Sequence, residues 1–187
     1  MSDEDRERWD RRHAAGSHSE VPTGLWLDEL GALIPAQGRA LDVATGSGRI
    51  GLWLAARGLE VTAVDISAVG LARCQVTASR LGLRMHMRHV DLEEEPLPRG
   101  PWQVVTCFHY LQRALFPVLR DALAPGGLLI CEIATRRNLE RHARPSARFL
   151  LEEGELAELV APLDIVHGEE GWFDDRALAR VVARRAS

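Results

Sequence analysis

Three closely spaced glycines and an aspartate are the residues best suited to bind a ligand. Gly46, Gly48 and Gly51 follow an apolar run, and Asp42 lies at the end of that run, four residues before Gly46. Glycine lets a chain turn tightly, so a strand that enters such a turn and continues into a helix exposes backbone N–H groups to a ligand. The spacing matches the G-x-G-x-x-G pattern of dinucleotide sites. The sequence therefore predicts a turn that holds a nucleotide-like cofactor.

The charge of Asp42 separates two interpretations of this turn. A carboxylate there repels a pyrophosphate and attracts a cationic ligand. S-adenosylmethionine combines a nucleoside with an ammonium and a sulfonium group, so we expect this cofactor and a methyltransferase. An NAD-binding oxidoreductase is the less favoured alternative, because a second nucleotide-binding half and a substrate domain do not fit within 187 residues.

Acidic residues also end the next two predicted strands, at Asp65 and Asp91. In an open parallel sheet, ligands bind in the crevice at the carboxyl ends of the strands. Asp65, 19 residues beyond Gly46, is placed to accept hydrogen bonds from both ribose hydroxyls. Each aspartate alone is also explained as a turn residue or helix cap, and Asp91 precedes an acidic stretch that fits a solvated loop. Their coincidence with the glycine turn favours binding.

Two residues after the predicted fourth strand are the catalytic candidates. Methyl transfer is an in-line displacement, so the protein must hold the acceptor about 3 to 3.5 Å from the methyl carbon. His109 is the candidate general base, because histidine titrates near neutral pH. Packing or a hydrogen bond to the cofactor explains His109 equally well. Tyr110, the only tyrosine in the chain, is the second candidate, as a hydroxyl or an aromatic wall.

Other charged residues are candidates for contact with the acceptor. Glu132 ends the predicted fifth strand, and Arg113, Arg144 and Arg148 are placed to form a clamp for an anionic acceptor. Solvated surface arginines are the alternative explanation.

Near the start of the chain, Trp9 and His13 belong to a charged helix that either closes over the cofactor as a lid or caps the sheet.

Short β-like runs alternate with helix-like runs, the pattern of a parallel sheet with helices on both faces. Strands are expected at 39–44, 59–65, 85–91, 102–108 and 128–134, with later β-like runs at 163–168 and 177–184, the last of which also fits a helix. An amphipathic segment covers 25–33, and helices are expected at 49–57, after the N-cap Ser67, at 112–123 and at 153–160. The predicted fold class is α/β, with a doubly wound, mostly parallel sheet.

Composition limits the setting and the partners. The 187 residues, 46% of them hydrophobic, suffice for one core and one domain. A formal net charge of −4 provides no basic field for a nucleic acid. No run approaches the roughly 20 apolar residues of a membrane span, so we expect a cytoplasmic monomer or homodimer without a membrane partner. Cys74, Cys107 and Cys131 lack the spacing of a zinc or redox motif, so we expect free thiols and no metal.

Four segments resemble, in order, the motifs of class I S-adenosylmethionine-dependent methyltransferases: 40–48, 61–67, 91–92 and 124–130. The segments 9–13, 108–113 and 144–156 are similar to the small tellurite-resistance and thiopurine-type methyltransferases of bacteria. The resemblance implies a seven-stranded sheet of order 3-2-1-4-5-7-6. It also implies one domain with an N-terminal lid (1–38), a cofactor core (39–135), and a substrate loop with the last strands (136–187).

The resemblance further implies that the methyl acceptor is a small molecule, and a chalcogen oxyanion is one of the candidates. It also implies how the cofactor is held. Glycines of the turn pack under the methionine part, Asp65 binds ribose, and Asp91 with Leu92 flanks adenine. Ala44 stands where the commonest form of the motif has its first glycine. The implied cofactor residues are Asp42, Ala44, Gly46, Gly48, Arg49, Asp65, Ile66, Asp91, Leu92 and Phe108. A module that binds the cofactor without catalysis remains the alternative from a different class.

Overall fold

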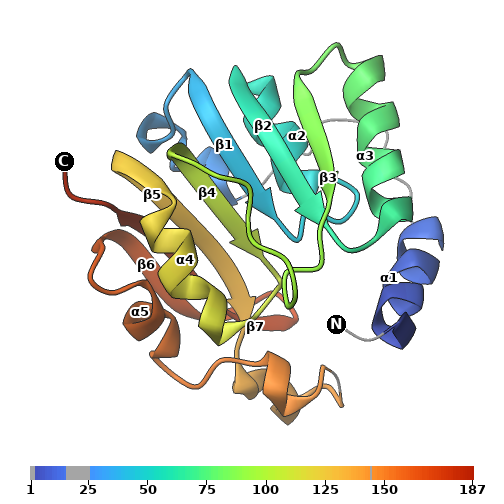
Figure 1. The fold of residues 1–187 in the computed structure, drawn as a ribbon. Helices are drawn as coiled ribbons and strands as arrows, with labels where there is room; N and C mark the ends of the chain where they lie inside the picture. Colours follow the sequence, from blue (N-terminus) through green and yellow to red (C-terminus); the bar gives the residue numbers. More distant parts are fainter. Residues whose placement is uncertain (1–2, 16–25, 144) are drawn as a thin grey trace.

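The computed structural model describes residues 3–15, 26–143 and 145–187, which build one seven-stranded sheet with helices around it (Figure 1). The strands lie in the order β3-β2-β1-β4-β5-β7-β6. They are β1 (Gly38–Val43), β2 (Leu59–Asp65), β3 (Met85–His89), β4 (Trp102–Phe108), β5 (Leu123–Ala134), β6 (Asp164–Phe173) and β7 (Arg176–Arg184). Only β7 runs antiparallel to its neighbours, β5 and β6. The predicted order and the doubly wound α/β class are confirmed, and the carboxyl ends of β1 to β5 meet at one edge.

Helices pack on both faces of the sheet (Figure 1). The helices are α1 (Asp3–Ala15), α2 (Arg49–Ala56), α3 (Ala68–Arg80), α4 (Phe116–Asp121) and α5 (Glu155–Val160). One apolar core lies between the sheet and α2 and α3 and includes Trp53 and Cys74. The other lies under α4 and α5 and includes Phe116 and Leu156. The helix α1 packs against α3, close to the edge where the parallel strands end.

The strands differ in how much of each face they bury. Central strands such as β4 are almost continuously apolar, as expected where helices cover both faces. The outermost parallel strand β3 alternates instead. Its Met85 and Met87 belong to the core on the α2 side, whereas His86 and Arg88 are exposed on the opposite face. Residues 90–101, between β3 and β4, form no helix that would cover this face.

Several element boundaries differ from the sequence prediction. In the amphipathic segment 25–33, the described residues form two short 3₁₀ turns, at Trp26–Asp28 and Gly31–Leu33. The helix expected at 112–123 is the shorter α4, because Pro117 fits only its first turn and a 3₁₀ turn precedes it. The run 177–184 is a strand and not a helix, since it pairs along its length with β5 and β6. None of the helices described here is long and apolar enough to cross a membrane.

Candidate functional site

The glycine turn follows β1 at the edge where the parallel strands end. Ala44, Gly46 and Gly48 have φ angles of 55°, 57° and 91°, in the left-handed region. Glycine adopts this conformation freely, whereas for Ala44 it costs on the order of 1 kcal/mol. Gly48 also begins α2, and a Cβ at this position would collide with the Sγ atom of Cys74 in α3. The turn is therefore fixed by backbone conformation and by its close approach to α3.

The Asp42 carboxylate lies beneath this turn and not at its surface. Its side chain is 1% exposed. One oxygen accepts hydrogen bonds from Thr45 Oγ1 (2.5 Å) and the Gly51 N–H (2.9 Å), and the other accepts one from Thr106 Oγ1 (2.7 Å). Burial outweighs these donors and raises the pKa of Asp42 to about 6. The direct ligand contact expected from the sequence is therefore corrected: Asp42 organises the turn from below and places a buried negative charge there.

Asp65, at the end of β2, connects the glycine turn to the start of α3. Its Oδ2 accepts a hydrogen bond from the Gly46 N–H (2.7 Å), and its Oδ1 accepts one from the Ser67 N–H (2.8 Å). The carboxylate is 7% exposed, and burial raises its pKa. Each carboxylate oxygen has two acceptor positions, so Asp65 retains capacity for ribose hydroxyls. Two buried carboxylates thus lie at one glycine turn.

The helix α1 lies over the same turn. Asp10 accepts hydrogen bonds from Ser67 Oγ (2.6 Å) and the Val69 N–H (3.3 Å), at the start of α3. An ideal Cβ on Gly46 would lie 2.8 Å from the Cε1 atom of His13, so the imidazole rests directly on the turn. Burial lowers the pKa of His13, with an opposing effect from Asp65. The helix that carries Trp9 and His13 therefore lies at the site, where a lid would lie. Whether it acts as a lid or only caps the sheet stays a prediction.

His109 follows β4 at the same edge, with its own strained backbone. Its φ angle is 56°, and its N–H donates to the carbonyl of Glu132 over 2.7 Å. Non-glycine residues in this conformation are uncommon and concentrate at functional sites. Its Nε2 lies 3.4 Å from Glu132 Oε1. Burial lowers the pKa of His109, Glu132 raises it, and the positive charges of Arg176, Arg49 and Arg12 lower it further, so the neutral imidazole is favoured.

Arg180 is a residue of this cluster that the sequence did not reveal. Its Nε donates to Glu132 Oε2 over 2.7 Å, and its Nη1 donates to Glu169 over 3.1 Å. Its guanidinium carbon lies 3.8 Å from the ring centroid of Phe173. The register pairs Arg180 with both Glu132 and Glu169, a signal available only once β7 is known to be a strand. Glu132 is therefore held between an arginine and the candidate base.

Tyr110 and Asp91 have local partners. The Tyr110 hydroxyl donates to Gln112 Oε1 over 2.9 Å, and burial, followed by Glu93, raises its pKa. Its ring packs against the core on the α4 side, away from the cluster around Glu132. Asp91 Oδ1 accepts a hydrogen bond from the Glu93 N–H over 2.9 Å, as in a turn. Neither residue gains support for its predicted role from these contacts.

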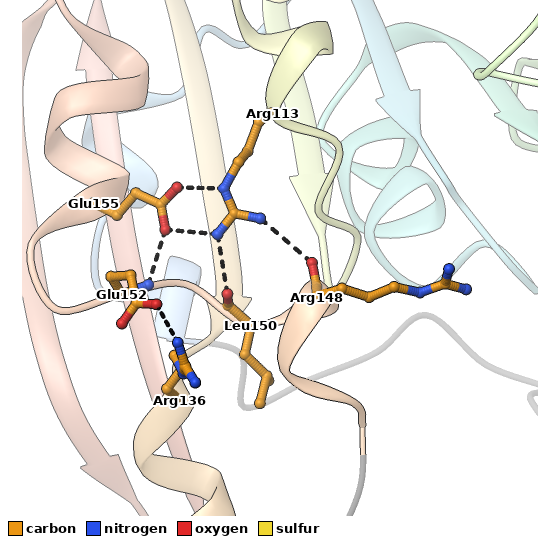
Figure 2. A network of polar contacts seen from close by, with 6 residues as sticks. All are labelled: Arg113, Arg136, Arg148, Leu150, Glu152 and Glu155. Carbon is orange, nitrogen blue, oxygen red and sulfur yellow. Dashed lines mark hydrogen bonds and ion pairs between the residues drawn. The ribbon is translucent and has the colours of Figure 1, made fainter.

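Arg113 is bound to a carboxylate of its own chain (Figure 2). Its Nε and Nη2 donate to the two oxygens of Glu155 over 2.5 and 2.8 Å, and Nη2 and Nη1 also reach the carbonyls of Leu150 (3.1 Å) and Arg148 (3.3 Å). Such a bidentate pair fixes the guanidinium. The predicted anion clamp is therefore corrected for Arg113, which instead ties the segment after β4 to the loop before α5. Of the two other members of that clamp, Arg144 lies outside the described residues, and the guanidinium carbon of Arg148 lies 4.3 Å from the ring centroid of Phe149.

The remaining predicted cofactor residues are Ile66, Leu92, Phe108 and Arg49. Ile66 and Leu92 are buried. Phe108 packs between Trp26 and His109, with ring centroids 6.3 Å from each. Arg49 is exposed at the first position of α2, beside Gly48. In the described part of the chain, no group of three or more histidine, cysteine or acidic side chains is arranged to hold a metal ion.

The part of the chain that includes the glycine turn is similar to known proteins. Residues 40–127 match the family described as a methyltransferase domain. This part, just under half of the 187 residues, is similar to a methyltransferase domain. The ribosomal protein L11 methyltransferase of Thermus thermophilus is 34% identical to the chain over 152 residues, which are 79% of this chain and 59% of that protein. The chain thus spans less than two thirds of this relative.

Solved structures resemble a larger part of the chain than the related sequence does. TehB from Haemophilus influenzae superposes with a TM-score of 0.73 at 19% identity, over 88% of this chain and 63% of that one. An S-adenosylmethionine-dependent methyltransferase from Mesorhizobium loti gives a TM-score of 0.67 at 20% identity, over 87% and 99% of the two chains. The chain therefore has the fold of these two proteins.

Proposed function

We propose that the chain binds S-adenosylmethionine at the glycine turn and transfers its methyl group to a small-molecule acceptor. The observation that carries the proposal is the pair of buried carboxylates joined to this turn, Asp42 through Gly51 and Asp65 through Gly46. Their negative charge suits a ligand with an ammonium and a sulfonium group and opposes a pyrophosphate. When bound, the cofactor supplies an electrophilic methyl group, and Asp65 accepts hydrogen bonds from its ribose.

His109 is the group best placed to take a proton from the acceptor. Its lowered pKa keeps the imidazole neutral at physiological pH, the form that a base requires. Glu132 orients the ring and stabilises the imidazolium that forms, because its Oε1 lies 3.4 Å from Nε2. Arg180 holds the other oxygen of the same carboxylate. Arg180 thus fixes the carboxylate of Glu132, and this carboxylate fixes the orientation of the His109 imidazole.

The charges around His109 favour an anionic acceptor. Arg12, Arg49 and Arg176 act on its imidazole from α1, from the start of α2 and from the start of β7. All three side chains are exposed. We assign to them the binding of an anionic acceptor, which the sequence analysis had assigned to Arg113. Carboxylates and oxyanions, chalcogen oxyanions included, are the groups that arginines bind best.

A cavity beside Arg180 lies near the cluster around Glu132, but neither His109 nor the glycine turn lines it. It has a volume of about 230 Å³ and is lined by Trp26, Glu29, Leu30, His167, Glu169 and Arg180. Two carboxylates, Glu29 and Glu169, line it beside Arg180, so we do not assign it to an anionic acceptor. α1 is the candidate lid, since the imidazole of His13 rests on the glycine turn.

Calorimetry and a labelled-methyl assay test the proposal together. S-adenosylmethionine and S-adenosylhomocysteine are expected to bind at one site and NADH not to bind, and Asp65→Ala should weaken both cofactor forms. With a panel of carboxylates and oxyanions, His109→Gln should lower turnover by roughly 10²- to 10⁴-fold without changing cofactor affinity. His86→Gln, on exposed β3, is the matched control. Binding of NADH, or full turnover by His109→Gln, contradicts the corresponding part of the proposal.

A further inference from the structure

One face of the sheet is left without a helix over β1 and β2. Figure 1 shows α4 in front of β4 and β5, whereas no helix lies in front of β1 and β2. On β1 and β2 this face is polar at the start of the strands, with Arg39, Glu60 and Thr62, whereas Leu41, Val43 and Val64 farther along belong to the apolar core. On β3 the side chains on this face are His86 and Arg88. Parallel sheets normally bury both faces under helices, so a polar face here departs from the rule.

This face forms the floor of a groove of about 840 Å³. The loop 96–99 and Trp102 form its wall. The floor is continuous from strand to strand, because Arg39 pairs in register with Glu60 and Thr62 pairs with His86. Neighbouring strands lie about 4.8 Å apart, so the groove crosses from β3 to β4 over roughly 14 Å.

The groove is positively charged. Arg39, Arg88 and Arg99 line it. Glu60 is the one acidic residue among those that line the groove, and its Oε1 lies 3.2 Å from the Nε2 atom of His86. Arg39 stacks on Trp102, with its guanidinium carbon 4.3 Å from the ring centroid. Arg88 and Arg99 are exposed and have no side-chain hydrogen bond or ion pair within the described ranges. Two arginine side chains thus remain available to an anionic partner.

The strand β3 offers a second means of recognition. It begins the sheet order and pairs only with β2, so its outer edge has no strand partner among the described elements. A free edge presents backbone N–H and C=O groups to an extended chain. In such a chain, alternate side chains point to one face, and here that face is the groove with Arg88.

We propose that this groove binds an extended acidic segment of a partner protein, laid along β3. The positive charges come from β1, β3 and the 96–99 loop, spread around the groove instead of gathered at one point. No glycine-rich turn or helix N-terminus lines it, as a compact phosphate would require. A ligand with several carboxylates along an extended backbone matches both the charges and the free edge.

The groove is separate from the methyl-transfer site. Arg39 and Trp102 lie at the starts of β1 and β4, whereas the glycine turn and His109 follow the ends of these strands. Arg88 lies nearer to that site, because it pairs with Val64, the residue before Asp65. The inference does not depend on the proposed function, and the two are tested by different ligands.

Fluorescence anisotropy of the full chain with a labelled peptide of five Glu-Thr repeats tests the proposal. Binding should weaken as salt is raised, and the double variant R88E/R99E should weaken it roughly tenfold or more, because it places like charges opposite the peptide. R84E is the matched control. Arg84 is exposed directly before β3 but does not line the groove, so its reversal should change affinity less than about twofold. S-adenosylhomocysteine affinity should be equal in all variants.

Several outcomes overturn the inference. The wild-type chain fails to bind the acidic peptide at low salt, or R88E/R99E binds it as tightly as the wild type. Equal weakening by R84E shows a non-specific charge effect. Displacement of the peptide by inorganic pyrophosphate at equal concentration shows a site for a compact anion, which also contradicts the proposal.

Discussion

The variant Asp42→Asn tests whether a buried, ionised carboxylate lies under the glycine turn. In the folded chain the pKa of Asp42 is raised from its ordinary value of 3.8 to about 6, with burial as the largest cause. A raised pKa means that the protonated form stabilises the fold, and that this stabilisation is lost as the pH rises through about 6. The difference between the two values corresponds to roughly 3 kcal/mol in the free energy of unfolding.

An asparagine at position 42 can keep the same hydrogen bonds without the charge. Its amide oxygen accepts from the Gly51 N–H and Thr45 Oγ1 in place of Oδ2. Its amide nitrogen donates to Thr106 Oγ1, whose own hydrogen turns to the carbonyl of Leu41, 3.4 Å away. The substitution therefore removes the cost of the buried anion without leaving an unpaired polar group.

Urea unfolding at a series of pH values measures the effect. The free energy of unfolding of Asp42→Asn, relative to the wild type, should rise by roughly 2.4 kcal/mol between pH 4 and pH 7.5, because part of the full difference is already present at pH 4. Asp164→Asn, an exposed aspartate at the start of β6, is the control and should give a small difference. A pH-independent difference, or a variant that loses stability as the pH rises, refutes the reasoning.

The remaining predictions concern packing, an ion pair and the base. Gly48→Ala should destabilise the fold by about 2 kcal/mol or more, measured by urea unfolding, and Cys74→Ala should restore only the part due to the collision. Arg113→Ala should lower stability by about 1 kcal/mol, because the Arg113 side chain is 43% exposed although Glu155 is mostly buried. The KM for the acceptor should not change, and a large increase in KM would support the anion clamp. The pH profile of kcat/KM should rise with a midpoint below 6.5, and Glu132→Gln should move it lower, since Glu132 raises the pKa of His109.

The sequence predicted the sheet and the glycine turn because both depend on local patterns. The central strands β1, β2, β4 and β5 are largely apolar runs, and two of the three positive φ angles in the turn fall on motif glycines, Gly46 and Gly48. The last strand was ambiguous for a physical reason. The run 177–184 is apolar enough for either a helix or a strand, and only its pairing with β5 decides.

The roles of individual charged residues depended on partners far away in the chain. Asp42 is oriented by Thr106, 64 residues later, and Arg113 is bound by Glu155, 42 residues later. Neither spacing is visible as a periodic pattern. Arg180 was missed for the same reason, since its contact with Glu132 exists only in the register of β5 and β7.

The most direct test of the central claim is the number of protons released when S-adenosylmethionine binds at pH 6, measured by calorimetry in two buffers of different ionisation enthalpy. A cation bound above the glycine turn lowers the pKa of Asp42, so the wild-type chain should release roughly half a proton more than Asp42→Asn, whose affinity should also be weaker. Equal proton release by the two proteins, or tight binding by Asp42→Asn, would contradict the account.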